Sequence, residues 1–202
     1  LYETEKRVEF HFDVRKLPIR EPEAVYVAFP FQWADGEVFY EAQGGLVSPG
    51  RNQLPSSSSD WQTVQNFVAV RGKDGQIIWG SDRIPLVQFG DINLGKWQPI
   101  AKVERPHVYS WVMNNYWFTN FRATQEGEFK WSYYLTSTRE TGNAPATRFG
   151  WGSRVPLVSR VLPPGKVGSS KTSLSLLQCD APNLLLVESR PAWDGKGLIL
   201  HW

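Results

Sequence analysis

Short apolar runs separated by turn residues recur along the whole chain, and this pattern limits the possible folds more than any other feature. Segment 8–14 alternates apolar and polar residues with the period of two that is typical of a half-buried strand. Segment 24–29 is continuously apolar, which is typical of a strand covered on both faces. The sequence therefore favours β-structure from its beginning.

Further strands follow from the same signals. An Asp-Gly pair at 74–75 separates the apolar runs 67–70 and 77–79, and such a pair predicts a β-hairpin. Segment 128–135 alternates well and is rich in the aromatic residues that favour pleated surfaces. We expect the other strands at 86–89, 108–113, 173–177, 184–188 and 197–202.

Helical periodicity is weak. The best candidate is residues 61–65, with Ser59 and Asp60 as the N-cap. The segments 48–59 and 141–146 have loop composition, and 163–170 could link two sheet halves. Since 14 Pro and 17 Gly interrupt many short strands, we predict an all-β fold with little helix, forming one sandwich domain over residues 1–202.

The charge balance excludes some classes of partner. Lys and Arg total 22 and Asp and Glu total 20, so the net charge is +2 and no basic patch indicates nucleic-acid binding. No run of basic residues indicates a membrane surface site. No segment approaches the roughly 18 consecutive apolar residues of a membrane helix. We expect neither nucleic acid nor a membrane as partner.

Residues that could hold a metal or act as a nucleophile are sparse. The one cysteine, Cys179, excludes an internal disulfide, and its apolar surroundings predict a thiol packed in a strand. The histidines His11, His107 and His201 lie far apart, and none has a partner at ligand spacing. We therefore predict no metal site in this chain.

Nothing in the sequence pairs two acids as glycoside hydrolysis requires. Phosphate-cradling glycine loops and the Gly-x-Ser-x-Gly motif are absent as well. We predict no catalytic residue and interpret the acids as solvated strand or turn residues. Examples are Asp60, Asp82, Asp91, Glu126 and Glu128.

Several sequence blocks stand in a definite order along the chain. The blocks are 21–31, 50–55, 60–68, 79–82, 85–92, 110–121, 127–129, 134–137 and 183–195. In this order they resemble the C-terminal β-region of glycoside hydrolase family 38, the α-mannosidase family, in its bacterial branch. The resemblance extends from about Tyr2 to Trp202.

This resemblance implies an antiparallel β supersandwich of the galactose-mutarotase type, and a chain that is a fragment of a larger multidomain glycosidase. In that family the nucleophilic Asp, the acid/base and the zinc ligands belong to an N-terminal barrel and a helical bundle. Their motifs are absent here. The resemblance therefore implies a non-catalytic domain without its own cofactor, packed on the catalytic N-terminal domain of a parent chain that retains configuration when it hydrolyses α-mannosides with zinc.

The resemblance also implies that a loop of this domain can reach the rim of the sugar pocket. The best loop is 50–61, and the stretch 114–117 also combines amides with aromatic rings. The substrate-binding candidates are Arg51, Asn52, Gln53, Asp60, Trp61, Asn114, Asn115 and Tyr116. Alternatively, 50–61 is a surface loop in which Asp60 caps a helix and Trp61 is buried, and the amides of Asn114 and Asn115 satisfy turn backbone.

Two other functions remain open from the sequence. An independent carbohydrate-binding module would show a narrow exposed aromatic strip. A stand-alone enzyme on the same scaffold, like a mutarotase, would bring His and acid residues together in one cleft. A domain severed from a catalytic barrel would instead expose an apolar patch larger than the few hundred Å² of ordinary monomers.

Overall fold

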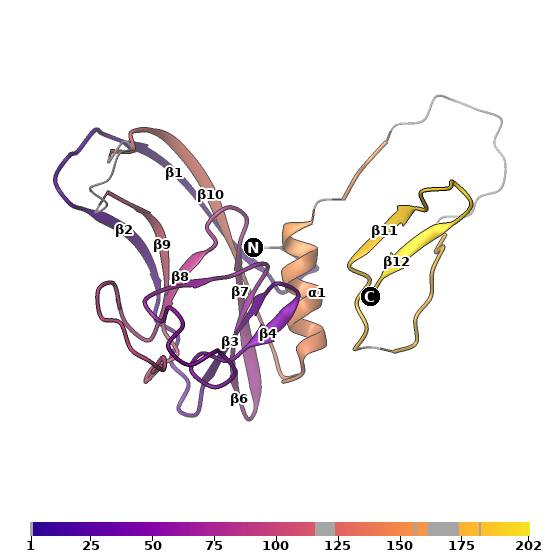
Figure 1. The fold of residues 1–202 in the computed structure, drawn as a ribbon, viewed down its shortest axis with the longest axis horizontal. Helices are drawn as coiled ribbons and strands as arrows, with labels where there is room; N and C mark the ends of the chain where they lie inside the picture. The colour runs from indigo at the N-terminus through magenta and orange to yellow at the C-terminus, as the bar shows by residue number, and fades with distance from the viewer. Residues whose placement is uncertain (1, 116–123, 156, 161–173, 182) are drawn as a thin grey trace. The chain divides into compact units, whose positions relative to one another are not determined.

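The computed structural model describes residues 2–115, 124–155, 157–160, 174–181 and 183–202. The chain divides into two compact units, Leu1–Pro156 and Leu157–Trp202. The first unit consists of two antiparallel sheets and one helix (Figure 1). The predicted all-β sandwich with little helix is confirmed.

The larger sheet has six strands in the order β1-β10-β7-β6-β3-β4, and the smaller has four in the order β2-β9-β8-β5. Every neighbouring pair is antiparallel. The strands of the larger sheet are β1 (Val8–Lys16), β3 (Glu37–Ala42), β4 (Gly45–Val47), β6 (Val68–Gly72), β7 (Gly75–Ser81) and β10 (Gly127–Thr138). Those of the smaller are β2 (Ala24–Phe29), β5 (Gln62–Thr63), β8 (Leu86–Phe89) and β9 (Val108–Asn114).

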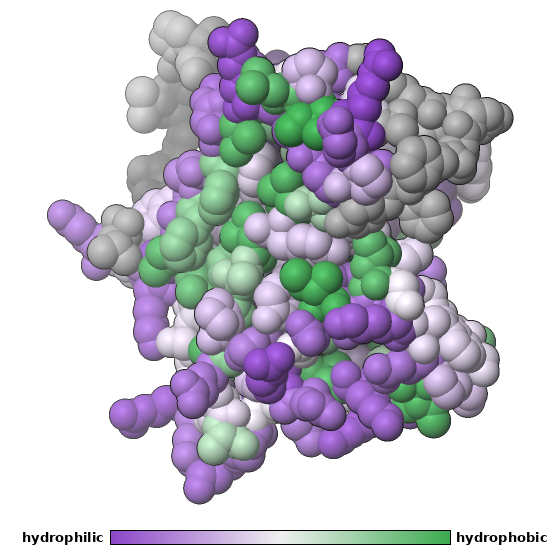
Figure 2. Space-filling view, turned by 90° about the vertical axis from the view of Figure 1, so that its left-hand side faces the viewer, coloured by the Kyte–Doolittle hydropathy of each residue, from purple (hydrophilic) through white to green (hydrophobic). Residues whose placement is uncertain are grey.

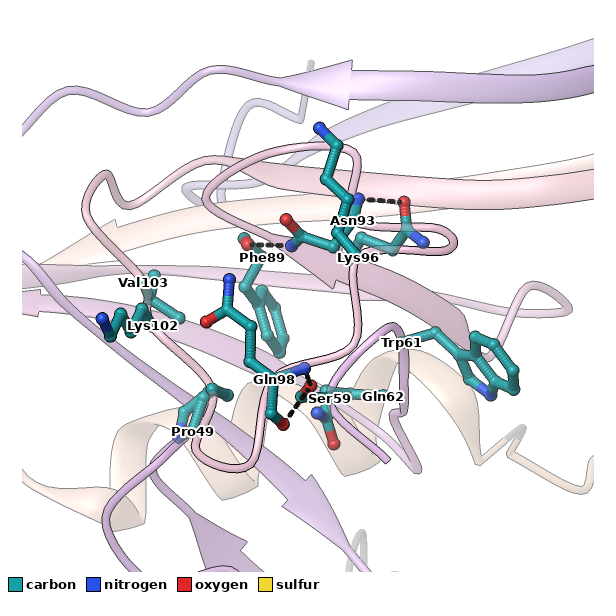
Figure 3. Close-up of a pocket in the computed structure, with 12 residues that line it drawn as sticks. Pro49, Ser59, Trp61, Gln62, Phe89, Asn93, Lys96, Gln98, Lys102 and Val103 are labelled. Atoms are coloured by element: carbon teal, nitrogen blue, oxygen red, sulfur yellow. Dashed lines mark hydrogen bonds between the residues drawn. The ribbon is translucent and has the colours of Figure 1, made fainter. Parts of the chain in front are cut away.

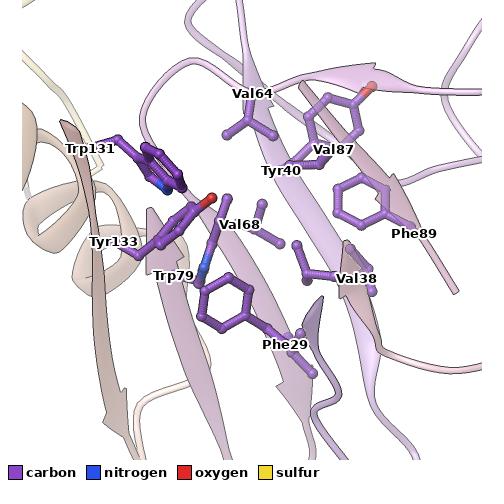
Figure 4. Close-up of a cluster of buried hydrophobic side chains, with 12 residues drawn as sticks. Phe29, Val38, Tyr40, Val64, Val68, Trp79, Val87, Phe89, Trp131 and Tyr133 are labelled. Atoms are coloured by element: carbon purple, nitrogen blue, oxygen red, sulfur yellow. The ribbon is translucent and has the colours of Figure 1, made fainter. Parts of the chain in front are cut away.

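The main core lies between the two sheets (Figure 4). The Tyr133 ring lies 5.4 Å from Trp79 of the same sheet and 5.0 Å from Phe29 of the other sheet. The Tyr133 hydroxyl donates a hydrogen bond of 2.8 Å to Ser110 Oγ, which also belongs to the other sheet. Alternation in the predicted strand 8–14 places Phe12 against this core, because Phe12 stacks on Trp131 at 5.1 Å.

One helix, α1 (Asn143–Arg154), packs against β7 and β10 of the larger sheet. Its Ala146 joins a second buried cluster with Phe67, Ala69 and Ile78. The prediction of a loop over 141–146 is therefore wrong. Pro145 is compatible with the helix because the first helical turn does not use its own N–H groups. Packing on the sheet compensates for weak helix propensity elsewhere in the segment.

The helix predicted over 61–65 is also wrong. Residues Gln62–Thr63 form strand β5, which pairs with Val87 and Leu86 of β8. Gln62 is buried and accepts a hydrogen bond from the Tyr40 hydroxyl, so tertiary contacts override the local capping signal. The predicted loop over 48–59 contains neither helix nor strand.

The hairpin of β3 and β4 has no counterpart among the predicted strands. Gln43 and Gly44 connect these strands with φ angles of 52° and 78°. Two successive positive φ values are typical of a tight type I′ hairpin turn, and glycine adopts such angles without strain. A Gln-Gly pair is a weaker sequence signal than the Asp-Gly pair of the β6–β7 hairpin.

The second unit contains one hairpin, in which β11 (Glu188–Pro191) pairs with β12 (Leu198–His201). β12 lies within the predicted strand 197–202, but the predicted strand 184–188 is wrong except for Glu188, because β11 begins there. Residues 174–177 form no strand, and Cys179 is exposed, so the prediction of a packed strand thiol is wrong. The expected link at 163–170 lies outside the described residues.

Close packing of α1 on the sheet predicts opposite effects for two glycines of the helix. A Cβ atom added at Gly150 would lie 2.7 Å from Phe67 Cβ, whereas one at Gly152 would meet nothing within 4 Å. We expect Gly150→Ala to lower the free energy of unfolding by about 1–3 kcal/mol. The control Gly152→Ala should raise it by roughly 0.5–1 kcal/mol. Urea denaturation measures both, and equal effects would contradict this packing.

Candidate functional site

Two loops of the first unit enclose a small pocket that contains part of the predicted site (Figure 3). One loop leads from β4 to β5 and the other connects β8 with β9. The cavity measures about 10 Å³ and is lined by Ser59, Trp61, Gln62, Gln88, Asn93 and Gln98, among others. A cavity of this size holds about one water-sized group, so a whole sugar ring does not fit inside it.

Hydrogen bonds tie the two loops together. Ser59 Oγ donates to the Gln98 carbonyl at 2.8 Å and accepts from the Gln98 amide at 2.9 Å. Asp60, a predicted sugar ligand, accepts a bond of 3.2 Å from the Gly95 amide through Oδ2. Its Oδ1 is buried and has no partner among the described residues. Asp60 therefore joins the loops instead of capping a helix.

Arg51 and Asn52 are occupied within their own part of the fold. Both terminal nitrogens of Arg51 donate to the Glu37 carboxylate, at 3.0 and 2.7 Å. Asn52 Oδ1 accepts from the Ser48 amide at 2.7 Å, and Nδ2 donates to the Leu46 carbonyl at 3.1 Å. The Asn52 amide thereby satisfies backbone groups of its own loop, a role that the sequence analysis did not assign to it.

Gln53 belongs to a hydrogen-bonded cluster with Tyr40 and Gln62. Its Nε2 donates to Gln62 Oε1 at 2.8 Å and to the Tyr40 hydroxyl at 3.2 Å. Its Oε1 accepts from the Gly50 amide at 3.0 Å. The Tyr40 hydroxyl donates to Gln62 Oε1 at 2.6 Å, and burial raises the pKa of Tyr40 to about 12. The cluster fixes the loop to β3 and β5.

Asn115 fastens the segment before β2 to the end of β9. Its Oδ1 accepts from the Glu23 amide, and its Nδ2 donates to the carbonyls of Ile19 at 3.1 Å and Glu21 at 2.7 Å. Only 6% of Asn115 is exposed. Its neighbour Asn114 is half-buried. The third candidate of this stretch, Tyr116, lies outside the described residues.

Trp61 lines the loop pocket, but its ring turns away from the polar side chains there. Figure 3 shows its ring pointing away from Gln98 and Asn93. The ring centroid lies 5.6 Å from that of Trp111, which in turn stacks on Tyr26 at 6.1 Å. Within the described part of the chain, Trp61 and the polar candidates therefore do not converge on one sugar-sized cavity.

Two glutamines of the loop pocket were missed by sequence reasoning. Gln88 is 1% exposed, and its Oε1 accepts from the Asn93 amide at 3.2 Å. Gln88 Nε2 and Gln98 Oε1 are buried without a partner among the described residues. A donor and an acceptor at this pocket could each bind a hydroxyl group. Single glutamines in a strand and a loop give no sequence signal for such a role.

The remaining predictions about cofactors and membranes concern absences. In the described ranges, no group of three or more His, Cys, Asp and Glu side chains is placed to hold a metal ion. No helix within those ranges is long and apolar enough to cross a membrane.

Comparison with known proteins gives no identification. No protein-family model matches this chain, and no curated protein matches it. The relation to glycoside hydrolase family 38 therefore remains a hypothesis based on the ordered sequence blocks.

The three hydrogen bonds of the Asn115 side chain predict a large loss of stability when that side chain is removed. Asn115→Ala should lower the free energy of unfolding by about 2–4 kcal/mol, because one buried N–H and two carbonyls lose their partner. The control Asn183→Ala changes an exposed residue and should alter stability by less than about 0.5 kcal/mol. A loss of similar size in both variants, measured by urea denaturation, would contradict the stabilising role of the Asn115 hydrogen bonds.

Buried Tyr40 predicts a dependence of stability on alkaline pH. Its pKa is raised from 10.0 to about 12, so the unfolded chain releases this proton at lower pH than the folded chain. The contribution of Tyr40 to the free energy of unfolding should be fully present below pH 10 and should be lost as the pH rises from about 10 to about 12. Tyr133 contributes in the same direction, since burial raises its pKa to about 12. In the Tyr40→Phe variant, the free energy of unfolding measured by urea denaturation should fall less between pH 10 and pH 12. A fall as large as in the unchanged chain would argue against this role of Tyr40.

Proposed function

We propose that this chain is a non-catalytic C-terminal β-domain of a family 38-like glycoside hydrolase of the α-mannosidase type. In this proposal it packs on the catalytic N-terminal domain of the same parent chain. The ordered sequence blocks support the family, and the antiparallel sandwich of the first unit agrees with the kind of fold that the resemblance implies.

The observation that carries the proposal is the internal use of polar side chains within those blocks. The side-chain amides of Asn52, Gln53 and Asn115 form hydrogen bonds with the protein's own backbone and side chains. These residues are suited to holding loops in a fixed shape. A fixed shape is what a domain needs when it supports another domain or the rim of its pocket.

Three acids of the first unit show the same internal use. Asp82 Oδ1 accepts a bond of 2.7 Å from the Ser132 amide, and Asp13 pairs with Lys130 at 2.7 Å. Asp91 Oδ1 accepts a bond of 2.8 Å from the Ile92 amide. These contacts favour structural roles for the acids over a paired acid and nucleophile. Catalytic carboxyls and zinc would then belong to the parent's other domains.

The loop region also offers a surface for the catalytic domain. Leu54 and Ile100 are 81% and 54% exposed, and both line a cavity of about 180 Å³ beside the loop pocket. Ser56 donates through its amide to the Pro99 carbonyl at 2.8 Å, so both residues stand on linked loops. On the face that Figure 2 shows, hydrophobic side chains are interrupted by hydrophilic ones. We propose the domain contact at Leu54 and Ile100 because both are exposed on linked loops.

A hydrolysis assay with an aryl α-mannoside tests the proposal. The isolated chain should show no turnover above the buffer control, because the proposal assigns no catalytic residue to it. The longer parent chain should be active. In the parent, the double change Leu54→Ser and Ile100→Ser should reduce activity or thermal stability by weakening the domain contact.

A matched double change, Leu17→Ser and Ile19→Ser, serves as control because it alters exposed apolar residues on the β1–β2 connection. Turnover by the isolated chain would overturn the proposal. Binding of mannosides to the isolated chain without turnover would instead favour the independent carbohydrate-binding module.

A further inference from the structure

A further cavity of the first unit lies beside the start of β1. It measures about 360 Å³, which is within the range of roughly 300–1,000 Å³ for small-molecule pockets. Its lining includes Tyr2, Lys6, Val8, Ile77 and Leu135. None of these residues belongs to the loop pocket or to the proposed domain contact.

The strand register explains why a cavity forms here. Pairing of β1 with β10 ends where Val8 lies opposite Leu135, but β10 continues to Thr138 in its pairing with β7. Before Val8 the chain turns, with the Arg7 amide donating to the Glu5 carbonyl at 2.8 Å. Thr136 Oγ1 donates to the Lys6 carbonyl and ties this turn to β10. The turn thus leaves space beside the last residues of β10.

The interior of this cavity is mainly apolar. Ile77 and Leu135 are half-buried and pack against the main core cluster, and Val8 is half-buried beside them. These side chains are anchored in paired strands, so the apolar wall is preformed. Covering such a wall with the apolar part of a ligand is favourable because it removes apolar surface from water.

Glu5, Lys6 and Arg7 line the cavity, and Glu9 lies next to Arg7. Arg7 pairs with Glu9 at 2.6 Å and lies 3.7 Å from Glu5. Lys6 is exposed, and no carboxylate of the described residues forms an ion pair with it. The Lys6 amino group, beside the Glu5 carboxylate held by Arg7, therefore remains available to a ligand at this cavity.

We propose that this cavity binds a small amphiphilic carboxylate. The apolar chain of the ligand lies against Val8, Ile77 and Leu135, and its carboxylate faces the Lys6 amino group. This site does not depend on the proposed glycosidase context, and its ligand is of a different chemical class from a sugar.

An NMR titration of methyl resonances with octanoate tests the proposal, with 1-octanol as an uncharged probe of similar chain length. Octanoate should shift the methyl signals of Val8, Ile77 and Leu135 in a saturable way and should bind more tightly than 1-octanol. Lys6→Gln should weaken octanoate binding about tenfold and leave 1-octanol binding unchanged. The control Lys73→Gln, on the β6–β7 turn, should change neither affinity.

A variant that fills the cavity gives an independent test. Ser137→Phe adds a ring beside Ile77 and should abolish the binding of both probes, while circular dichroism confirms that the variant is folded. The absence of saturable shifts in the unmodified chain would overturn the site. Equal affinities for octanoate and 1-octanol would overturn the role of Lys6, and shifts confined to the loop pocket would overturn the location.

Discussion

The contact between Tyr133 and the opposite sheet is the interaction on which the first unit depends most. The ring of Tyr133 packs on Phe29, and its hydroxyl donates to Ser110 Oγ, so one side chain links β10 to both β2 and β9. A buried hydroxyl without a partner would be costly, so this bond also fixes how the sheets align. The loops around the candidate site leave these same two sheets, and their geometry follows from that alignment.

Strand structure in the first unit was predictable because hydrophobic alternation reports which face of a strand is covered. Phe12 and Trp131 could be assigned to strand interiors from periodicity alone. The helix Asn143–Arg154 could not be predicted from the sequence, because Pro145 and two glycines reduce its helix propensity. Its stability comes from packing on Phe67 and Ile78. Strand β5 was hidden for a related reason, since the partners of Gln62 are distant in sequence.

The candidate site shows a clearer limit of sequence reasoning. Asn52, Gln53 and Asn115 were predicted as sugar ligands because their side chains form hydrogen bonds, but the sequence does not show whether the partner groups belong to a sugar or to the protein. The structure supplies internal partners for all three side chains. Conversely, Gln88 and Gln98 could be recognised as site candidates only from the structure, because folding places their unpaired atoms at one pocket.

The side-chain amides of Asn52, Gln53 and Asn115 hold the fold together and are not reserved for a ligand. Hydrogen exchange of the Ser48, Gly50 and Glu23 amides tests this most directly, because each donates to one of these side chains. We expect slow exchange that methyl α-mannoside leaves unchanged. Rapid exchange without sugar that becomes slow when the mannoside is added would contradict it, because the side chains would then be ordered by the ligand.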